Sequence, residues 1–492
     1  MLFNSYGFIF VFLPITLAGF FLSGRSTRAA ASWLVAASLF FYGYWNPVYL
    51  PLLLGSIAFN YFFGVKIARA DSAGRHDLKR LLLTVSICLN LGLLGYYKYA
   101  NFFLSGIDAL SGSSLPLGKI ILPLGISFFT FTQIAFLVDT GKGMVKEYNF
   151  LHYVLFVTYF PHLIAGPVLH HREMMPQFSR SETYRFDYGN MAVGLAIFFI
   201  GLFKKTVLAD GISIYVGPVF QAAGSGGHPG MFEAWMGALC YAFQIYFDFS
   251  GYSDMAIGLS RMFGITLPLN FDSPYKAVNI IEFWRRWHMT LSRFLRDYLY
   301  IPLGGNRKGK ARRYSNLIAT MLLGGLWHGA GWTFLVWGGL HGIYLVINHG
   351  WHALRRRFGQ DTGAPISGGM RALSILATFM AVTVAWVFFR SDNMETALAM
   401  LKAMSGMNGM GSGGISRGTI NWLWILLLIT WLAPNTQQIM RDFRPALDVH
   451  VEDKASKLVW QPGWRWLAAH VALALFGVIS ISKVSEFIYF QF

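Results

Sequence analysis

Charged side chains are scarce in this sequence. Asp, Glu, Lys and Arg make up 13% of its 492 residues, whereas 55% of the residues are hydrophobic and the mean hydropathy is +0.46. This is too little polar material to cover the surface of a water-soluble protein. We therefore expect a polytopic integral membrane protein, for which a lipid bilayer replaces water as the solvent.

Several signatures of soluble enzymes are also missing. The two cysteines, Cys88 and Cys240, form no CxxC pair, and no HExxH sequence occurs, so we expect no bound metal or cofactor. There is no GxSxG elbow of a serine hydrolase. The stretch Gly304–Lys310 has the spacing of a phosphate-binding loop, but Ala311 replaces the Ser or Thr that such a loop requires.

Acidic residues are outnumbered by basic ones, which gives a formal charge of +17. The basic residues lie in short clusters between apolar runs, at Lys66–Arg80, Arg285–Arg313 and Arg355–Arg357. This distribution favours membrane lipids over nucleic acid as the partner. Under the positive-inside rule, we assign these three clusters to the cytoplasmic face.

Long apolar runs are abundant. A run of roughly 20 apolar residues can cross a bilayer as a helix, whereas open sheet edges cannot face lipid, so we predict an all-α fold. The first run lacks the basic start and the cleavage site of a signal peptide, and we expect it to remain as a helix. We predict one membrane-embedded domain over residues 1–492, with about 11 to 13 crossings. The runs are Tyr6–Leu22, Ala30–Tyr44, Tyr49–Val65, Leu81–Tyr97, Ile120–Val138, Leu151–Ala165, Met191–Val207, Phe232–Phe247, Asn316–Ile347, Arg371–Phe389, Ile420–Leu432 and Trp466–Ile481.

The segment Glu282–Tyr300 is more polar and has helical periodicity, with one apolar stripe. A second, polar face would carry Arg285, His288, Ser292 and Arg296. Such an amphipathic helix lies along the membrane surface or packs beneath it. Two interpretations stay open. The helix is an interfacial anchor, or its face with His288 and Ser292, flanked by cations such as Arg285, lines the entrance for an anionic donor.

His328 lies in the glycine-rich stretch Gly324–Trp332, within an apolar run that contains almost nothing else ionisable. An ionisable group at membrane depth needs a polar partner or a water-filled cavity and is a functional candidate by default. The glycines permit close approach of another backbone, or a break in the helix. The alternative is a core histidine with a satisfied hydrogen bond. We assign the neighbouring Trp327 to the same site, as a binding or supporting residue.

Histidine suits acyl transfer because a neutral imidazole can accept a hydroxyl proton and later return it to a leaving group. An enzyme that moves an acyl group from a thioester to an alcohol needs such a base, and donors for the developing oxyanion. We expect His328 to be the base, with His288 or a nearby side chain in the second role.

Other histidines receive different interpretations. His341, His349 and His352 follow in the same segment but drift toward the basic end, and we interpret them as interfacial. The adjacent pair His170 and His171 is too close in sequence to chelate from one helix face, and we expect it in a loop.

A further polar group occurs in Tyr246–Asp254, at the end of an apolar run. A buried carboxylate such as Asp248 must find a proton, an arginine or a hydroxyl. Asp248 is thus part of a structural ion pair, or it orients a catalytic histidine or binds substrate hydroxyls. We assign Ser250 the same supporting or substrate-binding role.

The sequence resembles the membrane-bound O-acyltransferases, in particular the bacterial branch with the alginate O-acetylation and teichoic acid D-alanyl transfer proteins. The stretches that carry the resemblance are Phe160–Pro167, Gln244–Gly258, Trp284–Gly305, Leu326–Gly329 and Phe487–Phe492. The resemblance implies a ring of helices around a narrow tunnel, with His328 as the family's membrane-embedded histidine and His288 as its upstream histidine.

The resemblance also implies a function. In this branch a cytoplasmic thioester, acetyl-CoA or an acyl carrier protein, gives its acyl group across the inner membrane to a cell-surface polysaccharide, often with an extracytoplasmic acetyltransferase as partner. The length of the chain and its long region after Arg390 favour the acetylating members. Our leading hypothesis is an inner-membrane O-acetyltransferase for an exopolysaccharide such as alginate. The alternatives are D-alanyl or other acyl transfer from a carrier protein, and a polysaccharide or lipid-linked sugar transporter, against which the lack of an internal repeat counts.

Overall fold

A computed structural model describes residues 1–111, 120–164, 166–359, 367–412, 414–447 and 458–482. Within these ranges the chain is helical and contains no β-strand, which confirms the predicted all-α fold class. Two parts of the resembling stretches, Ala165 and Phe487–Phe492, lie outside the described residues.

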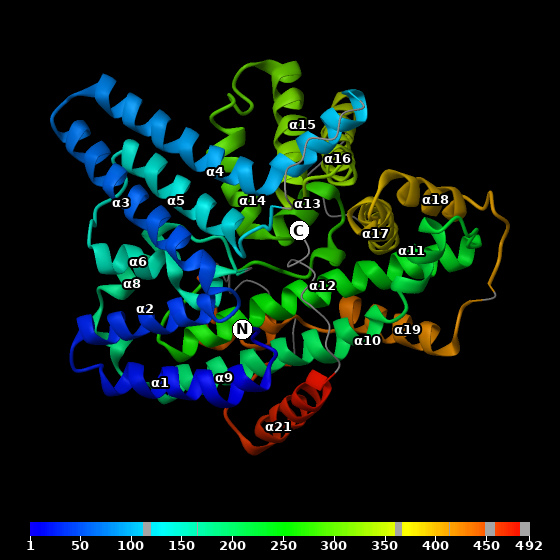
Figure 1. The fold of residues 1–492 in the computed structure, drawn as a ribbon. Helices are drawn as coiled ribbons and strands as arrows, with labels where there is room; N and C mark the ends of the chain where they lie inside the picture. The colour runs from blue at the N-terminus through cyan, green and yellow to red at the C-terminus, as the bar shows by residue number, and fades with distance from the viewer. Residues whose placement is uncertain (112–119, 165, 360–366, 413, 448–457, 483–492) are drawn as a thin grey trace.

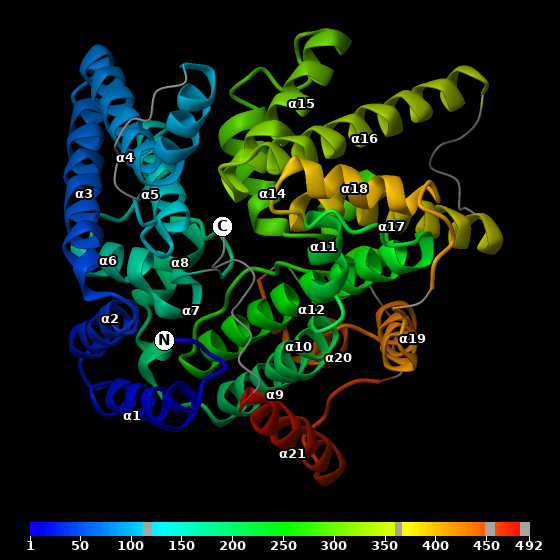
Figure 2. The same cartoon turned by 45° about the vertical axis from the view of Figure 1, so that its right-hand side comes forward.

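Figures 1 and 2 show α12 (Met231–Met262) near the centre of the molecule, with α9 (Tyr188–Phe203) alongside it. The helices before α12 are α1 (Leu13–Leu22), α2 (Thr27–Gly43), α3 (Leu50–Ser72), α4 (His76–Ser111), α5 (Ile126–Gly141), α6 (Phe150–Thr158), α7 (Phe160–Leu163), α8 (His171–Phe178), α10 (Asp210–Ser213) and α11 (Gly217–Gly224). Those after it are α13 (Ile280–Arg286), α14 (Met289–Leu295), α15 (Gly309–His328), α16 (Trp332–Arg357), α17 (Gly368–Arg390), α18 (Met394–Met404), α19 (Arg417–Leu432), α20 (Thr436–Ile439) and α21 (Trp464–Ile479). Stretches of π-helix are η1 (Phe8–Phe12), η4 (Lys204–Ala209) and η6 (Arg296–Tyr300), and 3-10 turns are η2 (Pro47–Tyr49), η3 (Ser181–Tyr184), η5 (Pro274–Lys276), η7 (Arg441–Phe443) and η8 (Ser480–Ser482).

Every predicted apolar run overlaps a helix, and the run Asn316–Ile347 divides into α15 and α16. Among the described residues, four helical stretches are long and apolar enough to cross a membrane: Pro47–Ser72, His76–Ile107, Tyr188–Ser213 and Gly368–Arg390. Shorter apolar helices are Phe8–Leu22, Ile126–Gly141, Arg417–Leu432 and Trp464–Ile479. These helices agree with a multi-pass membrane protein; the number of crossings stays a prediction.

Glycines bring α9 and α12 close together. A Cβ atom added to Gly201 would lie 2.6 Å from the carbonyl oxygen of Gly251, and one added to Gly194 would lie 2.7 Å from that of Gly258. Side chains cannot approach backbone atoms this closely, so only glycine allows the two backbones to pack at this distance. The pair forms a rigid support for the residues that α12 presents to the rest of the molecule.

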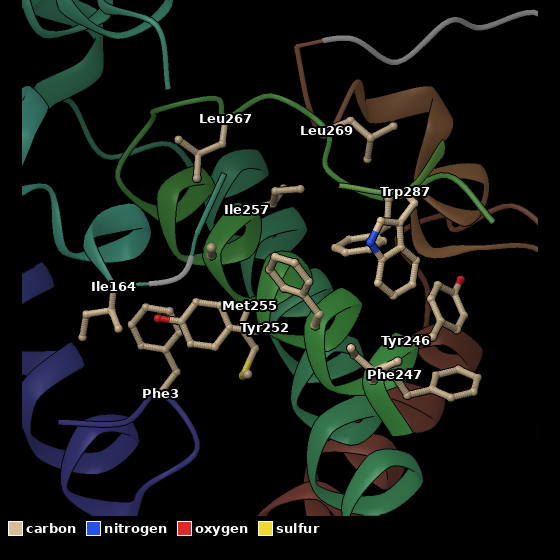
Figure 3. Close-up of a cluster of buried hydrophobic side chains, with 14 of the residues drawn as sticks. Phe3, Ile164, Tyr246, Phe247, Tyr252, Met255, Ile257, Leu267, Leu269 and Trp287 are labelled. Atoms are coloured by element: carbon tan, nitrogen blue, oxygen red, sulfur yellow. The ribbon is translucent and has the colours of Figure 1, made fainter. Parts of the chain in front are cut away.

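Aromatic side chains of α12 build the core on two sides of the helix (Figure 3). On one side Phe3 stacks on Tyr252, with ring centroids 4.7 Å apart. On the other side Tyr246 packs against Trp287, at 6.4 Å. The core thereby joins the N-terminal segment to the segment that leads into α14, where His288 lies.

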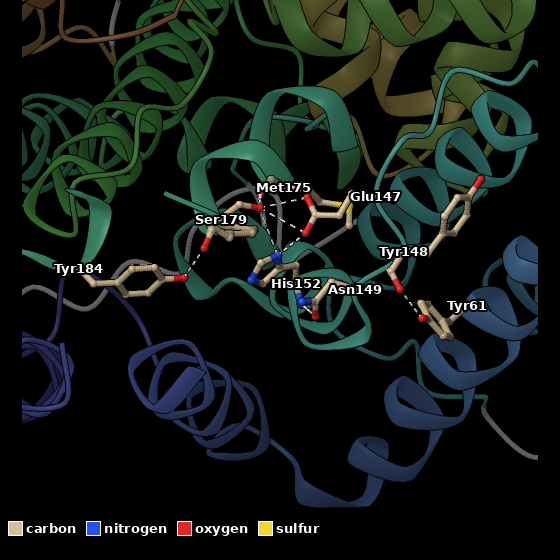
Figure 4. A network of polar contacts seen from close by, with 9 residues as sticks. Tyr61, Glu147, Tyr148, Asn149, His152, Met175, Ser179 and Tyr184 are labelled. Carbon is tan, nitrogen blue, oxygen red and sulfur yellow. Dashed lines mark hydrogen bonds and ion pairs between the residues drawn. The ribbon is translucent and has the colours of Figure 1, made fainter. Parts of the chain in front are cut away.

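A polar network ties the loop after α5 to α6 and α8 (Figure 4). The carboxylate of Glu147 binds the ring of His152 and accepts a hydrogen bond from the Ser179 hydroxyl, at 3.2 Å. Tyr61 of α3 donates to the backbone carbonyl of Tyr148, at 2.5 Å. These contacts fix the loop after α5 against α3, α6 and the end of α8.

The prediction of a loop at His170 and His171 is confirmed for His170, which precedes α8, and wrong for His171. His171 is the first residue of α8, and both side chains are buried. They are buried because polar partners meet them inside the protein. The Tyr298 hydroxyl lies 3.2 Å from His170 Nδ1, and Asp139 Oδ2 lies 3.4 Å from His171 Nδ1.

The prediction of one continuous helix over Glu282–Tyr300 is also wrong. The segment forms α13, α14 and η6, with a break at Trp287 and His288. The break turns the side chain of His288 into the protein, whereas Arg285 is exposed. The two residues therefore do not share one polar face.

Backbone pairing with the preceding loop causes this break. The N–H of Asp272 donates to the carbonyl of Arg286 (2.9 Å), and the N–H of Met289 donates to the carbonyl of Asn270 (3.0 Å). Backbone groups that bond to a neighbouring segment are not available to continue the helix. The helical periodicity of the side chains gives no information about this long-range pairing.

Candidate active site

His288 has a strained backbone at the start of α14. Its φ and ψ are 43° and 52°. This left-handed region costs a non-glycine residue roughly 1–2 kcal/mol. The exposed fraction of the residue is 0%. Such strain persists where the surroundings enforce it and is found preferentially at functional sites.

Asn270 sets the orientation of the His288 imidazole. His288 Nδ1 lies 3.1 Å from Asn270 Oδ1, and the Thr290 hydroxyl and backbone N–H lie 3.0 and 3.4 Å from the same oxygen. A backbone N–H can only donate, so this atom of Asn270 is an acceptor, and His288 Nδ1 must carry the hydrogen. In the neutral ring the lone pair is therefore on Nε2.

Segments far apart in the sequence meet at His288. The backbone N–H of Val168 donates to Thr290 Oγ1 at 2.9 Å, which directs the Thr290 hydroxyl hydrogen toward Asn270. From α12, Phe249 lies edge-on to the imidazole, with centroids 4.7 Å apart. The position of His288 thus depends on α12, on the segment after α7 and on the loop before α13.

His328 is the last residue of α15 and is 4% exposed. Its ring centroid lies 6.4 Å from that of His288. Aromatic rings surround it, with centroids at 4.8 Å for Trp327, 5.1 Å for Trp337 and 5.2 Å for Phe389. The structure therefore brings together His288, His328 and Trp327, three of the predicted site residues.

Close packing of α15 against α16 fixes the position of His328. A Cβ atom on Gly325 would lie 2.2 Å from the Phe334 carbonyl oxygen, and one on Gly338 would lie 2.3 Å from the Met321 carbonyl oxygen. Backbone therefore contacts backbone one helical turn before His328, as the glycine-rich sequence predicts.

Two cavities lie near the histidine pair, and His328 lines the smaller one. The larger, of about 670 Å³, lies among α13 to α16 and η6, and its lining includes Met289 and Thr290, next to His288. The smaller, of about 90 Å³, is lined by His328, Trp327 and residues of α4 and α5. Among the described residues, none lines both cavities.

The larger cavity is strongly basic. Its lining includes Ser292 and four arginines, Arg285, Arg293, Arg296 and Arg313. Ion pairs with Glu173 and Asp297 hold Arg293 and Arg296, at 2.6 and 2.7 Å. The predicted residues Arg285 and Ser292 thus line one cavity beside His288, although they do not share a helix face with it.

Asp248 belongs to a separate buried group. Its Oδ1 lies 2.7 Å from Lys205 Nζ, which also lies 2.8 Å from Asp210. Consecutive residues of a helix point about 100° apart, so Phe249 faces His288 while Asp248 faces η4. Of the roles considered for Asp248, this contact agrees with a structural ion pair. Ser250 is buried on the same helix, and its predicted role stays a prediction.

The interpretation of His341 as interfacial is wrong. Its exposed fraction is 0%, and Trp284 Nε1 donates to its Nδ1 at 3.3 Å. It is buried because Trp284 and Trp337 enclose its ring, at centroid distances of 5.1 and 4.9 Å. His349 and His352, farther along α16, are only partly buried.

A bound metal ion needs several side chains placed together as ligands. In the part of the chain that the structure describes, no group of three or more His, Cys, Asp or Glu residues is placed to hold a metal ion.

The sequence itself carries a family signature. The model of the membrane-bound O-acyltransferase family matches residues 78–386. The chain belongs to this family. The matched region runs from α4 to α17 and contains both histidines of the site. This membrane-bound O-acyltransferase is therefore a multi-pass membrane enzyme, as the apolar runs and His328 predict.

Curated relatives of this acyltransferase act on different polymers. A peptidoglycan O-acetyltransferase of Helicobacter pylori is 46% identical, over 86% of this chain and 83% of the relative. A probable alginate O-acetylase of Pseudomonas putida is 39% identical, over 100% of both chains. A teichoic acid D-alanyltransferase of Streptococcus thermophilus is 31% identical, over 54% of this chain and 68% of the relative.

Two residues of the candidate site were not predicted from the sequence. Asn270 lies between Pro268 and Pro274, in a stretch without helical periodicity, and no pattern marks it. Lys98 follows the apolar run Leu81–Tyr97 and contacts the backbone at His328. A signal for Lys98 was present, because it lies inside the apolar helix His76–Ile107, and an ionisable residue within a membrane run is a functional candidate.

Proposed function

We propose that this protein is an inner-membrane O-acetyltransferase that takes an acetyl group from cytoplasmic acetyl-CoA and passes it across the membrane for O-acetylation of a cell-surface polysaccharide. The observation that carries the proposal is the pair His288 and His328, whose rings lie 6.4 Å apart. His328 lines the smaller cavity, and Met289 and Thr290, next to His288, line the arginine-rich one.

The larger cavity suits an anionic thioester donor. The guanidinium groups of Arg285 and Arg313 match the geometry of phosphate oxygens, which CoA carries. Arg313 belongs to one of the basic clusters that the positive-inside rule assigns to the cytoplasm. The donor would therefore enter from the cytoplasmic side, where acetyl-CoA is made.

The histidines supply the proton transfers that acyl transfer needs. His328 accepts the proton of an acceptor hydroxyl. The oxygen of that hydroxyl bonds to the acyl carbon of the thioester, and the carbon–sulfur bond breaks. The thiol then leaves with a proton, so one proton moves from oxygen to sulfur and none is consumed. His288 can accept this proton, because its Nε2 holds the lone pair when Asn270 binds Nδ1.

The relatives support acetyl as the group and a polysaccharide as the acceptor. Their names specify acetylation of peptidoglycan and alginate at 46% and 39% identity, whereas the D-alanyl relative is 31% identical over 54% of this chain. We propose an exopolysaccharide such as alginate, or a related envelope polymer, with an extracytoplasmic acetyltransferase as the partner that completes the transfer.

The test is thiol release from radiolabelled acetyl-CoA by the purified, detergent-solubilised protein, with water in place of the acceptor hydroxyl. We expect His328→Ala to lower the rate roughly 100- to 10,000-fold, the usual contribution of a general base. His352→Ala, a partly buried histidine outside the site, is the matched control and should keep the wild-type rate. Equal release by wild type and His328→Ala would reject the proposal. Thiol release only from an aminoacylated carrier protein would show that the donor is this carrier protein and not acetyl-CoA.

A further inference from the structure

Lys98 lies within the long helix α4, yet its side chain reaches the end of α15. The ammonium group donates to the carbonyl oxygens of Trp327 and His328, the latter at 3.4 Å, and to the Ser127 hydroxyl at 3.3 Å. A lysine at membrane depth is costly, so its presence requires a reason.

The end of α15 supplies that reason. The last four carbonyl groups of a helix have no donor within the helix, and a left-handed glycine commonly supplies backbone N–H groups to them. Gly329, which follows His328, is extended instead, with φ −160° and ψ 147°. The Tyr99 hydroxyl donates to the Leu326 carbonyl at 2.8 Å, and the Lys98 ammonium donates to the carbonyls of Trp327 and His328. Two adjacent side chains of α4 thus cap α15 from outside.

Charge and packing favour a lysine in this place. The C-terminus of a helix carries a partial negative charge, which a nearby cation stabilises. Lys98 Nζ also lies 5.8 Å from the centre of the Trp327 ring, whose face attracts a cation. Lys98 therefore holds both the backbone and the ring of the residue that precedes His328.

We propose that Lys98 is a positioning residue for acyl transfer, which fixes the last turn of α15 and thereby the distance of the His328 imidazole from His288. The proposal rests on the proposed function of these histidines. Lys98 lines the smaller cavity and not the larger one. It should consequently affect the rate of the chemical step and not the binding of the thioester donor.

The test compares Lys98→Met, which keeps the length of the side chain and removes its donors, with Lys98→Arg, which keeps a cation with donors. Lys66→Met is the matched control, because Lys66 is an exposed lysine of α3 whose ammonium lies over the Phe62 ring at 5.4 Å. For each full-length variant, folded protein is measured by gel filtration in detergent, and kcat and KM by thiol release from acetyl-CoA.

We expect Lys98→Met to lower kcat roughly 10- to 100-fold, the effect of misplacing a catalytic group by about 1 Å. The KM for the donor should stay within twofold, Lys98→Arg should restore most of the rate, and Lys66→Met should match wild type. A kcat of Lys98→Met within threefold of wild type would overturn the proposal, and so would a loss of rate that only parallels the loss of folded protein.

Two further measurements keep the outcome clear. If Lys98→Met does not fold, Tyr99→Phe is measured instead, because it removes the other side-chain bond to the end of α15. A lower kcat at unchanged KM supports the proposal, and an unchanged kcat overturns it. If wild type releases no thiol from acetyl-CoA, the proposed donor is wrong. In that case cells that express each variant are treated with base, and the amount of acyl groups released from their envelope is measured. This amount reports the effect of Lys98 whichever donor the enzyme uses.

Discussion

Gly324 and Gly325 are neighbours in α15, but alanine at the two positions should have very different effects. A Cβ atom on Gly325 would lie 2.2 Å from the backbone oxygen of Phe334, whereas real Cβ atoms essentially never approach another atom within 3.0 Å. The helices α15 and α16 must then separate by at least 0.8 Å, the difference between these distances. A Cβ atom on Gly324 meets only the end of the Leu295 side chain, at 3.2 Å, which can move aside.

The separation should matter because His328 lies one turn beyond Gly325. A shift of about 1 Å in a reacting group can cost about 100-fold in rate. We therefore expect Gly325→Ala to lower kcat roughly 100-fold, and Gly324→Ala to lower it less than about threefold. Overpacking of this kind also costs about 1–3 kcal/mol of stability, so both variants need a folded fraction measured by gel filtration.

The assay is thiol release from acetyl-CoA per folded molecule. Gly338→Ala and Gly339→Ala on α16 repeat the comparison from the other side. A Cβ atom on Gly338 would lie 2.3 Å from the Met321 carbonyl oxygen, and one on Gly339 would lie 3.5 Å from a Leu322 methyl group. Equal activities within either neighbouring pair would refute the claim that backbone packing positions His328.

Two further predictions concern buried polar groups. Asp248→Asn should destabilise the protein by about 1.5–3 kcal/mol, because it removes one of the two charge-assisted contacts of buried Lys205, which keeps Asp210; a thermal unfolding midpoint in detergent unchanged from wild type would contradict this. Asn270→Leu leaves His288 Nδ1 and the Thr290 hydroxyl without their acceptor, which costs about 1–3 kcal/mol for each group. It should lower kcat more than Thr290→Val, which removes the hydroxyl that bonds Asn270 and Val168 but leaves Asn270 bonded to His288, and steady-state kinetics of both variants would show the order.

Sequence reasoning located the helices and both histidines because these depend on local properties. Apolar runs of sufficient length are helical wherever they occur in a bilayer, and the rarity of ionisable groups in such runs marks His328. The proximity of His288 to His328 agrees with the resemblance of the flanking stretches to one family, and the distance of 6.4 Å is a result of the structure.

The errors have a common physical origin in contacts between distant segments. The break before α14 is made by backbone bonds to Asn270 and Asp272, which helical periodicity cannot reveal. His341 is buried because Trp284 packs over it, and His171 because Asp139 meets it from α5. In each case a residue that looks polar and exposed along the chain has a polar partner that is far away in sequence.

The aromatic rings around His328 also bear on whether ions can pass through the protein. Trp327, Trp337 and Phe389 surround the ring, and the two cavities have no lining residue in common within the described part of the chain. A constriction walled by apolar rings is poorly wetted, and hydrated ions do not cross it. Under the proposed transfer across the membrane, the enzyme must not leak protons or sodium, and the apolar rings around His328 would then also insulate the membrane.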